Sequence, residues 1–301
     1  MSNNSNIESG KFNQRLAAGV IFFCISAMAA IAEDAGTNQD KSGYTLFNPT
    51  PVALMRELNT DRPDKTESPY TVDAGHYQVE SDFFTYTHDH TTAGGADTKV
   101  DSWSFATLNL KAGLNNRSDF QIVLNPYNRV RTSDRVAHTV TDQSGFGDVM
   151  LRLKVNAWGD DGGKTAFGVM PFIKLPSNQD GLGNHAVEGG LIFPIAISLP
   201  ASFDLGAMTE FDWNQNSADH DYHTEFVNSI TLDHDIVGKL GGYVEFFSDI
   251  STESHSTWVG TFDVGLEYQV TENIQVDGGV NIGVTDSADD IDPFIGISIR
   301  F

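Results

Sequence analysis

A repeating alternation of apolar and polar residues runs from residue 75 to the end of the chain. In the stretch 119–130, Phe120, Ile122 and Leu124 share one face, whereas Asp119 and Gln121 share the other. This period of two is typical of a β-strand with one apolar face. We identify about twelve such segments, each about nine to thirteen residues long, which is the length that a tilted strand needs to cross a bilayer. They lie near 75–87, 101–114, 119–130, 146–156, 165–175, 187–198, 203–213, 222–233, 239–248, 258–269, 273–284 and 292–301.

The connections between these segments alternate between long and short. The long ones fall near 88–100, 131–145, 176–186, 214–221, 249–257 and 285–291, and the short ones near 115–118, 158–164, 199–202, 234–238 and 270–272. A soluble two-sheet sandwich also alternates apolar and polar residues, but it would not sort its loops by length. The pattern therefore predicts an all-β fold, a transmembrane up-and-down antiparallel β-barrel of about twelve strands, with tight turns in the periplasm and long loops outside.

The last ten residues fit a strand that closes such a barrel. Ile295, Ile297, Ile299 and Phe301 share one face, and the chain ends on that apolar face. Chain ends are usually polar and frayed, so an ordered apolar ending needs a partner strand. This ending resembles the terminal strand of bacterial outer-membrane proteins, whose last residue is commonly Phe. The resemblance implies that Phe301 is an assembly signal for the barrel assembly machinery, although a final strand of a soluble sandwich remains the alternative.

The first 32 residues have the pattern of a secretory signal peptide. Lys11 and Arg15 precede the apolar stretch 16–31, which ends in a small-x-small cleavage pattern at Ala30 and Ala32. The single cysteine lies inside this stretch, so the mature chain is predicted to contain no disulfide. We expect three parts: a signal peptide at 1–32, a periplasmic-side N-terminal segment at 33–74 that is a candidate plug, and an outer-membrane barrel at 75–301.

Charge limits the partners of the mature chain. Loss of the signal peptide changes the formal net charge from −23 to −24. Phosphate would repel so acidic a chain, which excludes nucleic acid as an expected partner. No later apolar run is long enough for a transmembrane helix, so the lipid bilayer must be crossed by strands.

The most distinctive motif precedes the first strand. Residues 59–69 read Asn-Thr-Asp-Arg-Pro-Asp-Lys-Thr-Glu-Ser-Pro. Together with Gly145–Asp148, Lys174–Pro176 and the Gly189, Gly190 and Pro194 set, this run resembles the outer-membrane β-barrel family described as transporters of the MetA pathway of phenol degradation. The resemblance extends from residue 59 to the end. It implies a porin-like channel in the outer membrane of a Gram-negative bacterium, with weakly polar aromatic compounds as solutes.

The motif also carries charges of alternating sign. Between its prolines the plug candidates are Asp61, Arg62, Asp64, Lys65 and Glu67. Such a segment is suited to docking against a charged wall, and we expect Arg62 and Lys65 to meet inward carboxylates such as Glu80 and Glu267. The alternative is a solvated periplasmic linker.

Charged residues on the polar faces of the strands should line the interior, because unpaired charge is costly against lipid. A barrel of about twelve strands should leave a narrow or a plugged channel, and the excess of carboxylates should favour cations or neutral solutes. A cross-braced interior without an open path is the alternative. The pore-lining candidates are Glu80, Asp82, Lys111, Asp148, Arg152, Lys174, Glu210, Asp212, Glu225, Glu245, Asp263, Glu267, Asp277 and Arg300.

The remaining motifs give weaker indications of function. The pairs His88 with His90 and His220 with His223 have a spacing that a metal can use, but they fall in or beside predicted outer loops, where solvated side chains are the better interpretation. The run Gly181–Ala186 imitates a dinucleotide motif but precedes a strand rather than a helix. We therefore predict no metal, no cofactor and no catalytic residue.

The favoured function is passive passage of a small solute through the outer membrane. A structural or adhesive barrel that uses its acidic outer loops is one alternative. An outer-membrane hydrolase is a second and weaker one.

Overall fold

The computed structural model describes residues 40–216 and 219–301. The predicted signal peptide lies outside these residues. Two short 3-10 helices, η1 (Val52–Leu54) and η2 (Ala93–Gly95), accompany the strands. The strands are β1 (Tyr77–Thr91), β2 (Thr98–Asn115), β3 (Ser118–Leu124), β4 (Tyr127–Asp134), β5 (Thr139–Gly145), β6 (Val149–Trp158), β7 (Thr165–Leu175), β8 (Glu188–Leu199), β9 (Phe203–Gln215), β10 (Tyr222–Val237), β11 (Leu240–Ser251), β12 (Val259–Thr271), β13 (Ile274–Gly283) and β14 (Ile291–Arg300).

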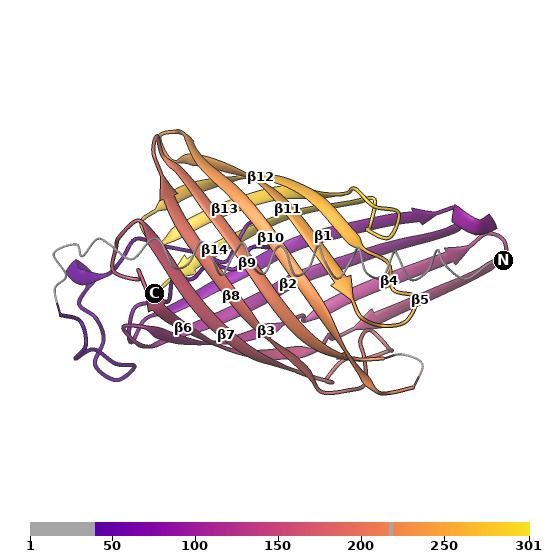
Figure 1. The fold of residues 1–301 in the computed structure, drawn as a ribbon, viewed down its shortest axis with the longest axis horizontal. Helices are drawn as coiled ribbons and strands as arrows, with labels where there is room; N and C mark the ends of the chain where they lie inside the picture. Colours follow the sequence, from indigo (N-terminus) through magenta and orange to yellow (C-terminus); the bar gives the residue numbers. More distant parts are fainter. Residues whose placement is uncertain (1–39, 217–218) are drawn as a thin grey trace, which may run out of the picture. The chain divides into compact units, whose positions relative to one another are not determined.

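The strands form one closed antiparallel barrel (Figure 1). The first strand, β1, pairs with β2 on one side and with the last strand, β14, on the other. In the closing seam Gln78 lies opposite Arg300 and Ser81 lies opposite Ile297. Closure satisfies the backbone groups of the edge strands, which lipid cannot do. The predicted fold class is confirmed.

The fourteen strands correspond to twelve barrel strands, because two of the twelve are each broken into two parts. The long strand β2 pairs with β3 along the half that leads to Asn115 and with β4 along the half that begins at Thr98. The break between β3 and β4 falls at Asn125 and Pro126, where proline has no N–H to donate to a ladder. The next barrel strand is broken between β5 and β6 at residues 146–148. The predicted number of strands is therefore correct.

Two of the predicted outer loops are mostly strand. The connection expected at 88–100 shrinks to residues 92–97, because β1 continues to Thr91 and β2 begins at Thr98. The connection expected at 131–145 shrinks to residues 135–138, between β4 and β5. Both stretches are polar on both faces, so apolar periodicity could not reveal them, yet their backbones still pair.

The barrel is apolar outside and polar inside. Leu266, Phe262 and Ile295 are exposed on the outer surface, whereas the side chains of Lys154 and Asp263 are buried in the interior. Within the part of the chain that the structure describes, no helix is long and apolar enough to cross a membrane.

Chain direction gives a testable orientation. The short turns lie at the same end as Tyr77 and Phe301, which pair with each other, so we expect this end to face the periplasm. We name it the periplasmic end, or mouth, and the opposite end the outer end. The described residues contain no cysteine. Single cysteines at Ala96, His138 and Asp219 should therefore react on intact cells with a membrane-impermeant thiol reagent. A cysteine at Lys164 should react only after the outer membrane is opened, and the reverse labelling pattern would invert the orientation.

Candidate functional site

Residues 59–69, which we call the lumenal segment, lie inside the barrel and contact strands from several sides of its wall. Asp61 contacts β2 and β6, Arg62 contacts β1 and β13, and Lys65 contacts β11 and β12. The extended backbone follows from Pro63 and Pro69, which restrict it and cannot donate hydrogen bonds. The segment therefore satisfies its polar groups with side chains of the wall.

Asp61 is the most enclosed charge of the lumenal segment. Its Oδ2 atom lies 2.5 Å from Nζ of Lys111, and its Oδ1 atom forms an ion pair with Lys154. Oδ1 also accepts a hydrogen bond from the backbone of Ser68 at 3.1 Å. Burial alone would raise the pKa of Asp61, but the two ammonium groups hold it well below its usual range. The carboxylate is thus a fixed negative charge between β2 and β6.

Arg62 contacts a neighbouring part of the wall, on β1 and β13. Its guanidinium pairs with Asp82 and lies 2.5 Å from Asp277, and it sits 5.5 Å from the centre of the Phe294 ring. A Cβ atom at Gly296 would overlap this guanidinium, so the wall leaves room for it there. Burial alone would lower the pKa of Arg62, but Asp277 and Asp82 keep it above its ordinary value.

These partners differ from those expected. Arg62 does not meet Glu80, whose carboxylate instead pairs with Lys111 and accepts the backbone N–H of Asp61. Among the described residues, Glu267 forms no salt bridge with Arg62 or Lys65. The alternation of residues in a strand shows which side chains point inward. It does not show which of these side chains lie at the same level along the barrel axis as the lumenal segment.

Lys65 and Thr66 fix the middle of the segment. Nζ of Lys65 lies 3.2 Å from Asp263 and 2.9 Å from the Thr261 hydroxyl. The backbone N–H of Lys65 and the Thr66 hydroxyl both donate to Glu245, at 2.9 and 2.6 Å. Inward carboxylates of β11 and β12 therefore hold both main chain and side chains.

The remaining two carboxylates of the segment are less well neutralised. Glu67 forms an ion pair with Arg152, yet burial raises its pKa, and its Oε2 atom has no hydrogen-bond partner among the described residues. Burial and the neighbouring Glu245 and Asp233 raise the pKa of Asp64 well above its usual range. Asp64 has no cation within salt-bridge distance in the described part of the chain.

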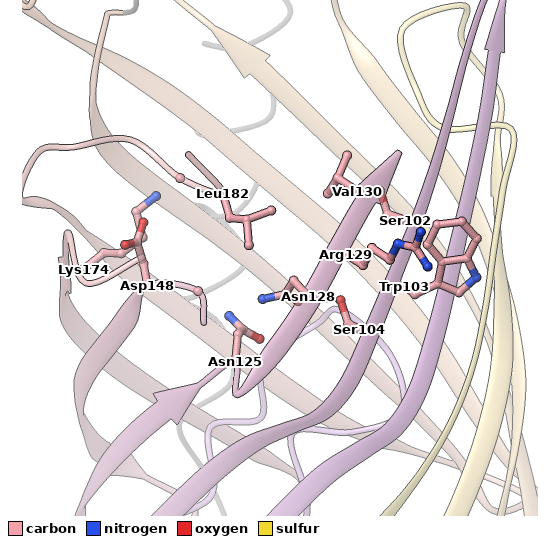
Figure 2. A pocket seen from close by; sticks show the side chains of 12 residues that line it. Ser102, Trp103, Ser104, Asn125, Asn128, Arg129, Val130, Asp148, Lys174 and Leu182 are labelled. Atoms are coloured by element: carbon pink, nitrogen blue, oxygen red, sulfur yellow. Dashed lines mark hydrogen bonds between the residues drawn. The ribbon is translucent and has the colours of Figure 1, made fainter. Parts of the chain in front are cut away.

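Other pore-lining candidates lie away from the lumenal segment. Asp148 accepts hydrogen bonds from Asn178, and Lys174 pairs with Glu188. Asp148 and Lys174 line a cavity of about 410 Å³ at the interruption of the wall, and Figure 2 shows them on one side of it. Arg300 lies at the periplasmic mouth, where it donates to the carbonyl of Arg56.

Three acidic candidates form a group on neighbouring strands. Glu225 lies opposite Asp212 in the β9–β10 ladder. Glu210 lies two residues before Asp212 on β9 and therefore faces the same side. Glu225 also accepts hydrogen bonds from His223 and Asn214. The inner wall of β9 and β10 is therefore acidic on the outer side of the lumenal segment.

An apolar cluster on the inner wall escaped the sequence analysis. Met170, Ile192, Met208 and Val227 are buried inside the barrel, and the half-buried rings of Phe172 and Phe247 pack against them. The cluster adjoins the lumenal segment, because the backbone N–H of Glu67 points at the Met208 sulfur at 3.4 Å. The same alternation that places Lys174 inward also places Met170 and Phe172 inward, but it does not show that apolar residues of five strands meet in one cluster.

A second cavity, of about 530 Å³, lies at the periplasmic mouth. The stretch 52–58 forms one wall, and the periplasmic ends of β10–β13 form the other, with Glu267 and Gln275 among the lining residues. A space therefore exists between the N-terminal part of the chain and the barrel.

The histidine pairs have local partners. His88 and His90 lie within β1 rather than in a loop, 2.8 Å from Asp101 and 2.9 Å from Asp97. His223 pairs with Glu225 at 3.0 Å. In the ranges 40–216 and 219–301, no three His, Cys, Asp or Glu side chains are arranged to hold a metal ion.

Comparison with known proteins identifies a family and several solved structures that this chain resembles. Residues 60–301 match the model of the family described as "Putative MetA-pathway of phenol degradation". The fold is similar to that of an outer-membrane channel from Pseudomonas putida F1, with a TM-score of 0.61 and 12% identity over 81% of this chain and 100% of that one. The NanC porin (TM-score 0.48, 11% identity, 75% and 100% covered) and the CymD monoaromatic hydrocarbon channel (0.42, 9%, 75% and 88%) are more distant. No curated protein sequence matches significantly.

Proposed function

We propose that this chain, which belongs to the outer-membrane β-barrel family named after the MetA pathway of phenol degradation, is a channel. The channel allows passive passage of small, weakly polar solutes. The apolar cluster on the inner wall is the observation that carries this proposal. A barrel that served only as a structural element, or that passed only ions, would have no need for six apolar side chains on its inner wall beside the lumenal segment. Aromatic compounds of the phenol class are the solutes that such a surface and such a family suggest.

The path runs from the outer loops toward the periplasm. Solutes first meet the acidic wall of Glu210, Asp212 and Glu225, which disfavours anions. They then reach the apolar cluster, where the rings of Phe172 and Phe247 remain partly accessible. The periplasmic cavity beside residues 52–58 forms the exit.

The lumenal segment acts as the plug of this channel. Its five charged residues stand in the lumen, and four of them are tied to the wall by ion pairs. Such shielded pairs hold geometry better than surface pairs do. The resting conductance should therefore be low, and flux should depend on how firmly the segment is seated.

Transient block of the ion current by phenol tests the proposal. We expect phenol, present at equal concentration on both sides of a planar bilayer, to interrupt the current of single channels, because its ring binds the apolar cluster. Glycerol at the same concentration should not. The double variant Phe172→Ala/Phe247→Ala should shorten the blocks by about thirtyfold, since the two lost ring contacts contribute about 1 kcal/mol each.

The matched control removes two aromatic rings from the lipid-facing surface. Phe193 and Phe211 pack edge to face on that surface. Phenol should block the current through the variant Phe193→Ala/Phe211→Ala as it blocks the current through the unaltered protein. Equal block in all three proteins would place the phenol site elsewhere. Absence of any current from folded, inserted barrels would favour a structural or adhesive barrel, and lipid hydrolysis by the purified protein would favour an enzyme.

A further inference from the structure

At the outer end of the described barrel, the cations of the outward face lie in one sector. The connections 92–97, 176–187, 216–221, 252–258 and 284–290 contain no Lys or Arg but several Asp and Glu residues. The hairpin of β4 and β5 and the adjoining part of β2 instead carry Lys99, Arg129, Arg131 and Arg135. We call this group the basic sector.

These side chains belong to the outward face of the barrel. The exposed aromatic residues Phe105 and Tyr127 lie opposite each other on β2 and β4 and mark the lipid-facing surface. Two residues further out, Trp103 lies opposite Arg129, whose guanidinium stands 5.6 Å from the Trp103 ring (Figure 2). Arg131 and Lys99 follow at further steps of about 7 Å along their strands.

The aromatic residues set the depth of the basic sector. Trp and Tyr side chains prefer the boundary between acyl chains and head groups. Arg129 stands at the level of Trp103, and the next basic residues stand just beyond it. The basic sector therefore faces the head-group layer of the outer leaflet.

The carboxylates of the same face are already engaged. Asp101 accepts hydrogen bonds from Tyr86 and His88. Asp142 accepts two from Arg129, whose side chain is still 46% exposed. Among the described residues, Lys99 and Arg131 form no salt bridge, and both project from strands held on either side by a hydrogen-bonded neighbour. Arg131 lies opposite Asp101 and Asp142 in its two ladders, but the carboxylates of Asp101 and Asp142 are bound by Tyr86, His88 and Arg129, so Lys99 and Arg131 are available to an anion.

We propose that the basic sector binds the phosphate groups of lipopolysaccharide, the phosphorylated glycolipid of the outer leaflet. Lys99 and Arg131 contact a lipid A phosphate, and the acyl chains of the same molecule lie against Phe105 and Tyr127. The acidic loops repel lipid phosphates elsewhere around the rim, so the glycolipid is held at this sector, next to the interruption of the wall.

Lipid binding in detergent tests the proposal. The probe is diphosphoryl lipid A, added to the purified full-length mature barrel and counted per barrel by native mass spectrometry. The variant Lys99→Gln/Arg131→Gln should bind it about tenfold more weakly, because each basic residue near an anionic lipid surface strengthens the attraction. Arg117→Gln/Lys164→Gln removes two cations from periplasmic turns and should leave binding unchanged. Lys99→Arg/Arg131→Lys keeps both charges and should retain it.

Dephosphorylated lipid A separates phosphate recognition from adsorption of acyl chains. The unaltered protein should bind this lipid much more weakly than the diphosphoryl form. Equal binding of the two lipids, or equal binding of diphosphoryl lipid A by the unaltered protein and by Lys99→Gln/Arg131→Gln, would overturn the proposal. The comparison of the two lipids uses the unaltered protein, so it holds even if a variant fails to assemble.

Discussion

Replacement of Asp61 by alanine is expected to raise the single-channel conductance several-fold while the barrel stays assembled. Lys154, whose side chain is 1% exposed, has Asp61 as its only salt-bridge partner among the described residues. Lys111 would retain Glu80. Removal of one partner of a buried ion pair costs about 3–5 kcal/mol, because the other charge remains buried and unpaired. Movement of the segment away from Lys154 would let water reach this ammonium group and relieve the cost, so the lumenal segment should leave its seat more often.

Asp64 provides the matched control within the same segment. It is a carboxylate of the same segment, but no described cation lies within salt-bridge distance of it, and burial and its acidic neighbours already raise its pKa. Asp64→Ala should therefore leave the conductance unchanged or lower it by seating the segment more firmly. The two variants are compared in planar bilayers, and heat-modifiable migration confirms that both barrels are folded. Equal conductance of Asp61→Ala and the unaltered protein would show that the Asp61 ion pairs do not restrict the channel.

Deletion of Phe301 is expected to abolish assembly almost completely. Phe301 exchanges two backbone hydrogen bonds with Tyr77, at 2.8 and 3.3 Å, and its carbonyl also lies 3.1 Å from the ring of His76. These contacts complete the seam between β1 and β14, and an open edge in lipid leaves backbone groups unsatisfied. The amount of heat-modifiable protein in outer-membrane fractions measures the effect.

Substitutions separate the side chain of Phe301 from its backbone. Phe301→Asp keeps the hydrogen bonds with Tyr77 but removes the terminal aromatic group, so it should fail to assemble if the assembly machinery reads that group. Phe301→Tyr should assemble normally. Phe262, an exposed aromatic residue on β12, is the control, and Phe262→Ala should also assemble. Normal levels of folded barrel after deletion of Phe301 would refute its role as an assembly signal.

The fold could be predicted because a barrel wall is a local pattern repeated. The alternation of Ile295, Ile297 and Ile299 with polar residues specifies a strand and its lipid-facing side without any knowledge of its neighbours. Polar strand ends such as 88–91 could not be found in this way, because outside the bilayer neither face needs to be apolar. Their strand conformation comes from pairing with β2.

Only part of the candidate site could be predicted from the sequence. Inward carboxylates such as Asp277 and Asp263 follow from alternation, and both contact the lumenal segment. The pairing of Arg62 with Asp82 and Asp277 depends on strand tilt and on the irregularity of β1 between Asp82 and Phe84, which no local pattern encodes. The apolar cluster needs five strands to bring its members together, so it becomes visible only in three dimensions.

The attachment of the lumenal segment has a kinetic consequence. Thr71 and Val72 are held at the wall by Asp160 and Asp119, and Arg56 is held by Asp73 and Asp160, so a released segment is a loop that stays anchored at both ends. Eleven residues of extended chain reach at most about 40 Å, which keeps the loop near its seat at an effective concentration in the millimolar range. Reseating is then a first-order process within one molecule. Closures of the channel should occur at a rate that is independent of protein concentration, and no added peptide should compete well with them.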